Sequence, residues 1–162
     1  MKAFEDTTKN ALQHAFRLLA YRDRSAKEMH DRLARKGFSE GVIGETLHFL
    51  QEKRFIDDER LAGMLKRDAV ERKHFGRGGA KGYLLKRGIP GEVADAVLGD
   101  PDEYLDAARE LVEKKLKTMK GHDRETVRRR LWGLLSRRGF SPDIIRRTMR
   151  SFCDKEEFDE NW

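Results

Sequence analysis

Apolar residues recur three or four positions apart along most of the chain, which is typical of amphipathic α-helices. Near the N-terminus the apolar stripe consists of Ala11, Ala15, Leu18 and Leu19. No segment alternates apolar and polar residues with a period of two, so the pattern predicts no β-sheet. The sequence therefore predicts an all-α protein.

Residues that start and stop helices divide the first third of the chain into three helices. Ser25 and Glu28 have the spacing of a capping box, in which each side chain accepts from a free amide of the other residue. Gly37 predicts the end of that helix, because glycine adopts the positive φ that a helix stop often needs. Ser39 then predicts the start of the third helix.

A basic residue, a glycine and an apolar residue occur together three times, at Lys36–Phe38, Arg87–Ile89 and Arg138–Phe140. Their glycines are 51 residues apart in both steps, and a fixed period of this length indicates tandem repeats. We therefore expect three three-helix repeats of about 51 residues in an elongated, curved arrangement. The expected segments are an N-terminal tail at 1–9, repeats at 10–54, 55–100 and 101–153, and an acidic tail at 154–162.

The same signals place the helices of the later repeats. We expect Asp57 and Asp58 to cap the helix that opens the second repeat, and Gly76–Gly79 to form a loop before a helix that Gly88 ends. The residues expected to begin the following helices are Pro90, Asp100 with Pro101, Asp123, and Ser141 with Pro142.

The net charge of +6 is unevenly distributed. Residues 154–162 carry −4, so the rest of the chain carries +10, and 101–153 alone carry +6. Such a basic body indicates a polyanion or an acidic protein surface as partner, although a merely solvated helix surface would look the same.

Other features bear on where the chain resides. The sequence contains no run of 18 apolar residues that would span a membrane, and Met1–Asp6 does not resemble a secretory signal. A single cysteine, Cys153, excludes an internal disulfide framework. We therefore expect a cytoplasmic protein, and a monomer.

The glycine-rich stretch Gly76–Gly82 superficially resembles a phosphate loop. It departs from the Walker pattern because Lys81 is followed by Gly82 rather than by Ser or Thr. Two interpretations stay open: an anion bound by free amides at a helix start, and a flexible turn between two helices.

No group of residues has the spacing of a catalytic or metal site. The run Asp57–Glu59 lies at a helix start, where acidic residues are typical caps. The histidines are scattered, and Cys153 has no evident base partner. We expect no enzymatic activity, no metal and no cofactor.

Basic residues are the most informative candidates. Arg128–Arg130 lie on a helix whose apolar stripe includes Leu131 and Leu135, and Trp132 lies one turn from Arg128. Trp132 could stack on a base or a partner side chain, or it could fill the joint between repeats two and three. The residues predicted to contact nucleic acid or a partner are Arg72, Lys73, Arg77, Lys81, Lys86, Arg87, Arg124, Arg128, Arg129, Arg130, Trp132, Arg137 and Arg138.

A helix-turn-helix reader is a further alternative, with the helix after each glycine stop as the reading helix. In the second repeat that helix, Gly91–Ala96, is small and acidic, which disfavours base contacts. In the third repeat only Arg146, Arg147 and Arg150 could make them.

With these landmarks in place, the chain resembles the RecX family of recombination regulators over roughly residues 10–153. The matching positions are Ala15–Ser25 with Glu28, Leu33–Phe38, Phe55–Ala62, Gly76, Leu84, Arg87–Ile89, Lys114–Leu116 and Leu135–Ser141 with Ile144 and Ile145.

The resemblance implies a protein that lodges in the groove of the RecA–single-stranded DNA filament and suppresses its growth, ATP turnover, strand exchange and coprotease activity. It also implies no catalytic residues. Two alternatives stay beside it: a stand-alone nucleic-acid-binding protein, and a helical scaffold for some other protein.

Overall fold

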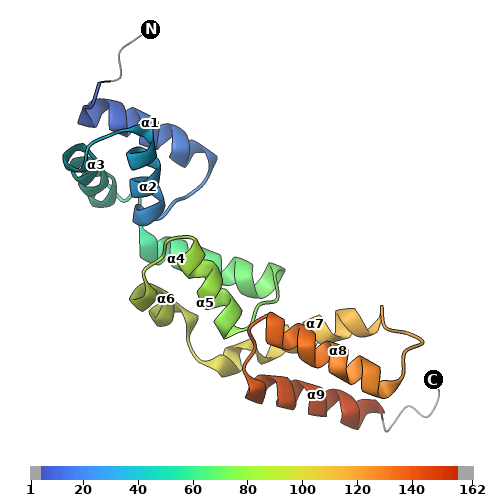
Figure 1. The fold of residues 1–162 in the computed structure, drawn as a ribbon. Helices are drawn as coiled ribbons and strands as arrows, with labels where there is room; N and C mark the ends of the chain where they lie inside the picture. Colours follow the sequence, from blue (N-terminus) through green and yellow to red (C-terminus); the bar gives the residue numbers. More distant parts are fainter. Residues whose placement is uncertain (1–4, 157–162) are drawn as a thin grey trace. The chain divides into compact units, whose positions relative to one another are not determined.

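The computed structural model describes residues 5–156, and in this range the chain forms helices and no strand (Figure 1). The all-α prediction is therefore confirmed, with three α-helices in each of three successive repeats. The α-helices are α1 (Thr8–Tyr21), α2 (Ala26–Lys36), α3 (Glu40–Glu52), α4 (Asp58–Arg67), α5 (Arg77–Lys86), α6 (Gly91–Leu98), α7 (Leu105–Leu116), α8 (Arg124–Arg137) and α9 (Pro142–Glu156).

Two short segments supplement these helices. A π-helical turn, Asp68–Arg72, prolongs α4, and a 3-10 turn, Pro101–Tyr104, precedes α7. The 3-10 turn has a capping box in which Asp100 and Glu103 bond each other's backbone amides, as expected for a start at Asp100.

The chain groups into two compact units. One consists of the residues up to Met64 together with Leu84–Val97, and the other of Leu65–Tyr83 together with the residues from Leu98 onward. Helices α4, α5 and α6 of the middle repeat thus contribute residues to both units. Each unit is described separately below.

Unit 1 is built around a core between α1, α2 and α3. The apolar stripes that the sequence shows are the faces that meet there, because burying them removes apolar surface from water. The fully buried members of this core are Ala11, Ala15, Met29, Leu33, Ile43 and Leu50.

Unit 2 has a larger core in which α7, α8 and α9 pack together with parts of the middle repeat. Tyr104 is almost completely buried, and its hydroxyl donates a 2.8 Å hydrogen bond to the carbonyl of Leu98. Burial raises the pKa of this hydroxyl to about 12. The other residues of this core with least exposure are Ala69, Ala80, Leu98, Ala108, Val112, Leu131, Leu135, Ile144 and Ile145.

The predicted helix stops have the expected conformation. Gly37, Gly88 and Gly139 have φ values of +102°, +78° and +80°, in the left-handed region that favours glycine. After Gly37, the amide of Phe38 donates to the carbonyl of Leu33, and the Phe38 ring is buried. This is the Schellman arrangement, which satisfies carbonyls at a helix end.

The prediction that Gly76–Gly79 form a loop is wrong, because α5 begins at Arg77 and includes Gly78 and Gly79. Tertiary contacts in unit 2 explain why glycines form a helical turn here. The Gly76 amide donates to the carbonyl of Arg138 at 2.9 Å, and the Gly78 amide donates to that of Gly139 at 3.0 Å. A Cβ on Gly79 would overlap the Arg138 carbonyl oxygen, so only glycine permits this approach.

We call such a contact between a glycine stop and a helix start of the preceding repeat a joint. A second joint lies in unit 1, where Gly88, at the end of α5, packs against the start of α2. A Cβ on Gly88 would lie 2.5 Å from Ser25 Oγ and 3.1 Å from Lys27 Cβ. Ser25 is fully buried and its hydroxyl accepts from the Glu28 amide at 3.0 Å, which confirms Ser25 as the helix cap. In both joints, therefore, the glycine that ends the second helix of one repeat packs against the start of the second helix of the preceding repeat.

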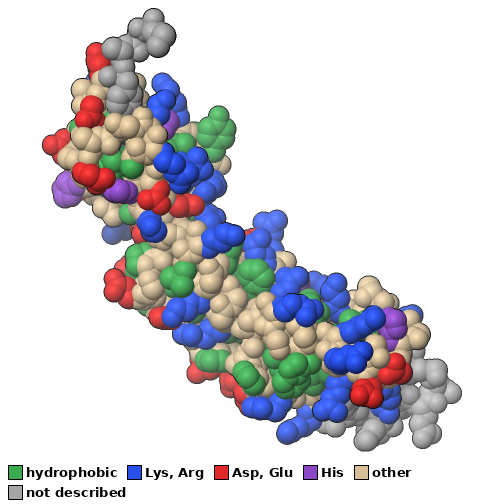
Figure 2. Space-filling view, in the orientation of Figure 1, with side chains coloured by type: hydrophobic (Ala, Val, Ile, Leu, Met, Phe, Trp, Pro, Cys, Tyr) green, Lys and Arg blue, Asp and Glu red, His purple; other side chains and the backbone are tan. Residues whose placement is uncertain are grey.

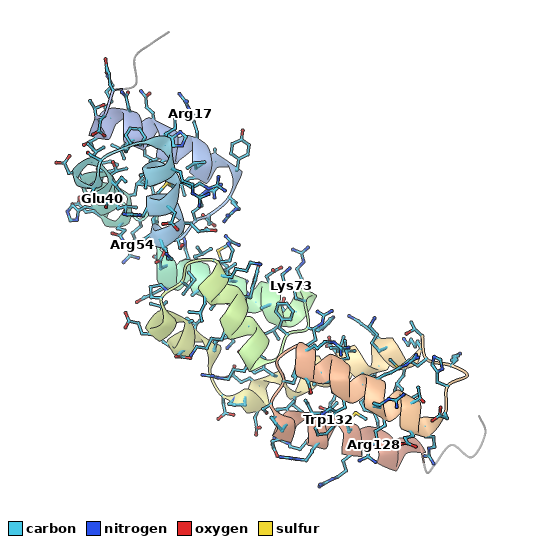
Figure 3. All side chains as sticks on the ribbon, in the orientation of Figure 1. Arg17, Glu40, Arg54, Lys73, Arg128 and Trp132 are labelled. Carbon is cyan, nitrogen blue, oxygen red and sulfur yellow. The ribbon has the colours of Figure 1, made fainter. Side chains whose placement is uncertain are left out.

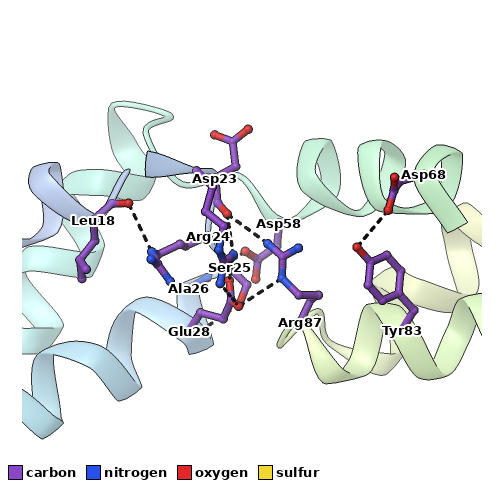
Figure 4. A network of polar contacts seen from close by, with 11 residues as sticks. Leu18, Asp23, Arg24, Ser25, Ala26, Glu28, Asp58, Asp68, Tyr83 and Arg87 are labelled. Atoms are coloured by element: carbon purple, nitrogen blue, oxygen red, sulfur yellow. Dashed lines mark hydrogen bonds and ion pairs between the residues drawn. The ribbon is translucent and has the colours of Figure 1, made fainter. Parts of the chain in front are cut away.

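Charged groups reinforce the joint of unit 1 (Figure 4). The Glu28 carboxylate accepts two hydrogen bonds from Arg22, at 2.8 and 2.9 Å, and one from Arg87 Nε at 3.2 Å. Arg87 also donates to the Asp23 carbonyl at 3.2 Å. Glu28 therefore binds arginines, and its expected bond back to the Ser25 amide gives way to these stronger charged partners.

Asp57 and Asp58 have different roles, although the sequence predicts the same role for both. Asp57 caps α4 through the amide of Arg60 at 2.9 Å, as expected. Asp58 Oδ1 instead accepts from the amide of Ala26, at the start of α2, at 2.9 Å. The prediction that Asp58 caps α4 is therefore wrong, because its side chain faces the first turn of α2 rather than the first turn of α4.

Gly79 and Gly82 make a matched test of the joint in unit 2. Gly79→Ala should destabilise the protein by about 2 kcal/mol or more, because the new methyl group overlaps the backbone at Arg138. Gly82→Ala has open space and should stabilise α5 by about 0.5–1 kcal/mol. Urea unfolding measures both, and equal effects from the two substitutions would contradict the joint.

Glu28 should make stability depend on acid pH. Burial alone would raise the pKa of Glu28, but the hydrogen bonds from Arg22 and Arg87 hold the pKa below its ordinary value of 4.5. A carboxylate with a depressed pKa contributes stability above its ordinary pKa and loses that contribution as the pH falls through the folded value. Glu28→Gln should therefore cost about 2 kcal/mol at pH 7 and flatten the acid decline.

Urea unfolding at pH 7 and below pH 4.5 measures this effect. Glu52→Gln, on the exposed side of α3, is the control that should leave both values unchanged. An equally steep acid decline in Glu28→Gln and in the parent protein would show that Glu28 has no such role.

Candidate partner-binding surface on helix α8

Helix α8 presents one apolar face to the core of unit 2 and one polar face to solvent. Asp123 caps its start by accepting from the Thr126 amide at 2.9 Å, as the sequence predicts. Leu131 and Leu135 are fully buried, whereas Val127 and Leu134 are half-buried. At 100° per residue, this stripe leaves Arg129 and Ser136 pointing away from the core.

Most of the predicted basic residues on α8 are exposed. Arg124, Arg128, Arg129 and Arg137 are accessible, as is Arg130, whose guanidinium lies 2.8 Å from the Nε2 atom of His122. Figure 2 shows Lys and Arg side chains over this part of unit 2. Guanidinium groups arranged along one helix suit phosphate or carboxylate ligands, which they bind through charge-assisted hydrogen bonds.

Trp132 lies on the same helix with 39% of its surface exposed. Figure 3 shows Trp132 close to Arg128 along α8. It is outside the core of unit 2, so its ring has a face available for a base or a partner side chain.

The start of α8 differs from the corresponding helix starts of the first two repeats. A shift of 51 residues relates Ser25–Glu28 to Gly76–Gly79 and these to Val127–Arg130. In the first two repeats, these residues contact the glycine stop of the following repeat. Helices α2 and α5 begin at Ala26 and Arg77, which correspond to position 128, whereas α8 begins four residues earlier, at Arg124. Arg128, Arg129 and Arg130 therefore occupy the position that forms a joint in the first two repeats, and they are exposed among the described residues.

The basic residues before α5 surround an aspartate. In unit 2, Arg72 and Lys73 lie 3.4 and 3.9 Å from the Asp68 carboxylate, and the Tyr83 hydroxyl donates to it at 3.1 Å. The Lys73 ammonium also lies 5.2 Å from the centre of the Tyr83 ring. Arg72 is mostly exposed, so it is the member of this group that is most accessible to a partner.

The basic residues of α5 have different environments. Arg77 Nε donates to the carbonyl of Gly99 at 2.9 Å, which ties the start of α5 to the segment before the third repeat. Lys81 is half-buried, and Lys86, which belongs to unit 1, is exposed.

Arg87 and Arg138 make contacts that hold the joints together. Arg87 donates to Glu28 and to the Asp23 carbonyl, and Arg138 donates to the carbonyl of Lys73 and lies over the ring of Phe75. Sequence reasoning missed these joint contacts. The signal that could have revealed them is that the arginine precedes the glycine in both repeats that have a predecessor, whereas the first repeat has Lys36.

The structure overturns anion binding by free amides at the glycine-rich stretch. The amides of Gly76 and Gly78 already donate to the carbonyls of Arg138 and Gly139. Among residues 5–156, no three His, Cys, Asp or Glu side chains gather in a way that could hold a metal ion. In the same range no helix is long and apolar enough to cross a membrane.

Of the three arginines on α9 that could read bases in a helix-turn-helix arrangement, Arg147 is paired with acidic side chains. The Arg147 guanidinium pairs with Asp102 at 2.5 Å and with Asp143 at 3.6 Å, and the bond to Asp102 raises its pKa above the ordinary value. Arg146 and Arg150 stay exposed on α9.

These features define a helical tandem-repeat protein with an exposed basic surface at its last repeat. Comparison with known proteins identifies the particular family. Residues 11–50 match the first three-helix domain of RecX, and residues 102–149 match the third. The Regulatory protein RecX of Chlorobium phaeobacteroides is 35% identical over 144 residues, covering 87% of this chain and 92% of its own.

A second relative agrees over a similar length. The Regulatory protein RecX of Chlorobium limicola is 32% identical over 145 residues, covering 89% of this chain and 91% of its own. The chain belongs to the RecX family.

A solved structure shows the same fold. The crystal structure of RecX from Lactobacillus salivarius superposes with a TM-score of 0.80 and 23% identity, over 89% of this chain and 95% of that one.

The arginines of α8 can be tested by charge-matched substitutions. Replacing Arg128, Arg129 and Arg130 with Gln should weaken binding of an oligo-dT strand at low salt by roughly tenfold or more. It should also reduce the slope of log K against log salt by about 2, because up to three phosphate contacts are lost. Fluorescence anisotropy at several salt concentrations measures both quantities.

The control removes the same charge from exposed positions in unit 1, by replacing Arg35, Lys36 and Lys53 with Gln. This variant should bind the strand almost as well as the parent protein. If both variants lose affinity equally, net charge rather than the α8 surface accounts for binding.

Proposed function

We propose that this protein regulates the RecA recombinase by binding in the groove of the RecA–single-stranded DNA filament. There it inhibits ATP turnover, strand exchange and coprotease activity, acting as a monomer without enzymatic activity of its own. The observation that carries the proposal is membership of the RecX family over nearly the whole chain. The proposal also implies a cytoplasmic protein, because RecA filaments assemble on DNA.

The α8 surface supports this proposal physically. The body of the chain carries +10, and exposed arginines lie along α8 beside a partly exposed tryptophan. Phosphates of a DNA strand and acidic side chains of a filament attract such a surface, and stacking on Trp132 would add affinity without requiring a particular base.

A second candidate is a stand-alone nucleic-acid-binding protein. The exposed arginines at Arg128–Arg130 are the observation that favours it, because they could bind DNA with no second protein present. A scaffold for another protein is the third alternative.

The deciding measurement is the DNA-dependent ATPase rate of RecA in the presence of the purified protein. We expect the rate to fall at protein-to-RecA ratios at or below one. The variant with Gln at Arg128–Arg130 should inhibit less than the control with Gln at Arg35, Lys36 and Lys53. An unchanged rate at several-fold excess of protein would rule the proposal out.

A pull-down separates the three candidates. A RecA regulator that binds the filament should retain RecA only when single-stranded DNA and nucleotide are both present. A stand-alone nucleic-acid binder should retain the DNA whether or not RecA is added, and a scaffold for another protein should retain neither.

A further inference from the structure

His74 lies in the segment between the π-helical turn and α5, directly before the joint of unit 2. Its φ of +49° is in the left-handed region, which residues other than glycine rarely adopt. Its side chain is only 12% exposed. Two residues later, the Gly76 amide donates to the carbonyl of Arg138, so the conformation at His74 bears on the joint.

The imidazole of His74 lies between two α7 side chains of opposite charge. Its Nε2 atom is 2.8 Å from the Lys114 ammonium, and its Nδ1 atom is 3.8 Å from the Glu110 carboxylate. A lysine ammonium can only donate hydrogen bonds, so Nε2 accepts and the single proton of the neutral ring is on Nδ1. Nδ1 is buried and has no hydrogen-bond partner among the described residues. The contact with Lys114 is therefore a property of the neutral imidazole.

A second proton on the ring would place a positive charge against Lys114. Arg138, which follows α8, adds positive charge at the same ring, and Glu110 opposes both. Burial, Lys114 and Arg138 together hold the pKa of His74 below its ordinary value of 6.5, although Glu110 raises it.

The other charged groups on neighbouring segments of unit 2 have partners elsewhere. Arg72 and Lys73 lie 3.4 and 3.9 Å from the carboxylate of Asp68. On α5, Arg77 Nε donates to the carbonyl of Gly99. Lys114 is therefore the cation that a protonated His74 would disturb first.

We propose that His74 is a proton-dependent tie between the joint of unit 2 and α7. The neutral ring holds Lys114. When the ring takes up a proton, its new Nε2–H repels the ammonium, the ring pairs with Glu110, and Lys114 is released to solvent. An anion that binds Lys114 in turn favours proton uptake, because linked equilibria affect each other equally. Only the use of the released cation for DNA rests on the proposed function.

An NMR titration of the His74 ring protons measures the tie with no DNA or RecA present, and His74→Asn assigns the signals. In the parent protein His74 should titrate below pH 6.5. Lys114→Gln should raise the pKa of His74, because it removes the ammonium charge, and Glu110→Gln should lower it. Both substituted side chains are exposed on α7, so neither change should impair folding. A pKa that neither substitution moves would overturn the proposal.

Stability should respond to pH in the same range. A base whose pKa is lower in the folded state keeps its contribution above the unfolded pKa and loses it as the pH falls through the folded pKa. Asn tolerates the left-handed conformation and does not titrate, so His74→Asn removes this effect. Between pH 7.5 and 5.5, the urea midpoint of the parent should fall more than that of His74→Asn. Equal declines would contradict the tie, and this range lies above the one in which Glu28 acts.

Binding of oligo-dT tests what the released cation does. From pH 7.5 to 5.5 the slope of log K against log salt should steepen by about 0.7 more in the parent than in His74→Asn, because Lys114 adds one contact with the strand. An equal change in both proteins would overturn the use of Lys114 for DNA. The NMR and urea results stand apart from the RecA ATPase test, since RecA is absent from them.

Discussion

The close approach of a glycine stop to the start of a helix is the constraint on which the rest of the structure depends. The first amides of a helix have no partner within the helix, and leaving one buried without an acceptor costs about 1–3 kcal/mol. In unit 2, the carbonyls of Arg138 and Gly139 accept from Gly76 and Gly78, which is possible only because no Cβ separates the two backbones. The 51-residue period therefore fixes a contact between repeats as well as the end of a helix.

The two joints satisfy the same requirement with different chemistry. In unit 1 the helix start keeps side chains: Ser25 caps it, Asp58 accepts from the Ala26 amide, and Glu28 binds arginines. In unit 2 glycines let backbone meet backbone directly. In both units an arginine before the glycine donates to carbonyl oxygen at the joint, so much of the charge of Arg87 and Arg138 is committed inside the fold.

The sequence could predict what depends on local periodicity, but not what depends on neighbours distant in the chain. Apolar spacing and the glycine stops predicted the helices of each repeat and the caps at Ser25, Asp57 and Asp123 correctly. Gly76–Gly79 were expected to form a loop because glycine has low helix propensity, yet contact with Arg138 and Gly139 outweighs that propensity. The same limit applies to the surface, since Arg87 and Arg129 look alike in sequence, and only the fold separates the partly buried charge of Arg87 from the exposed charge of Arg129.

The third repeat differs from the first two at the position of the joint. Helix α8 starts a turn earlier, and its Thr126 amide donates to the Asp123 side chain, whereas the Gly76 and Gly78 amides at the start of α5 donate to carbonyls of the following repeat. The positions freed from that task carry arginines. The same position in the repeat thus changes from a structural contact between backbones to an exposed basic surface, and its three arginines are part of the positive charge of residues 101–153.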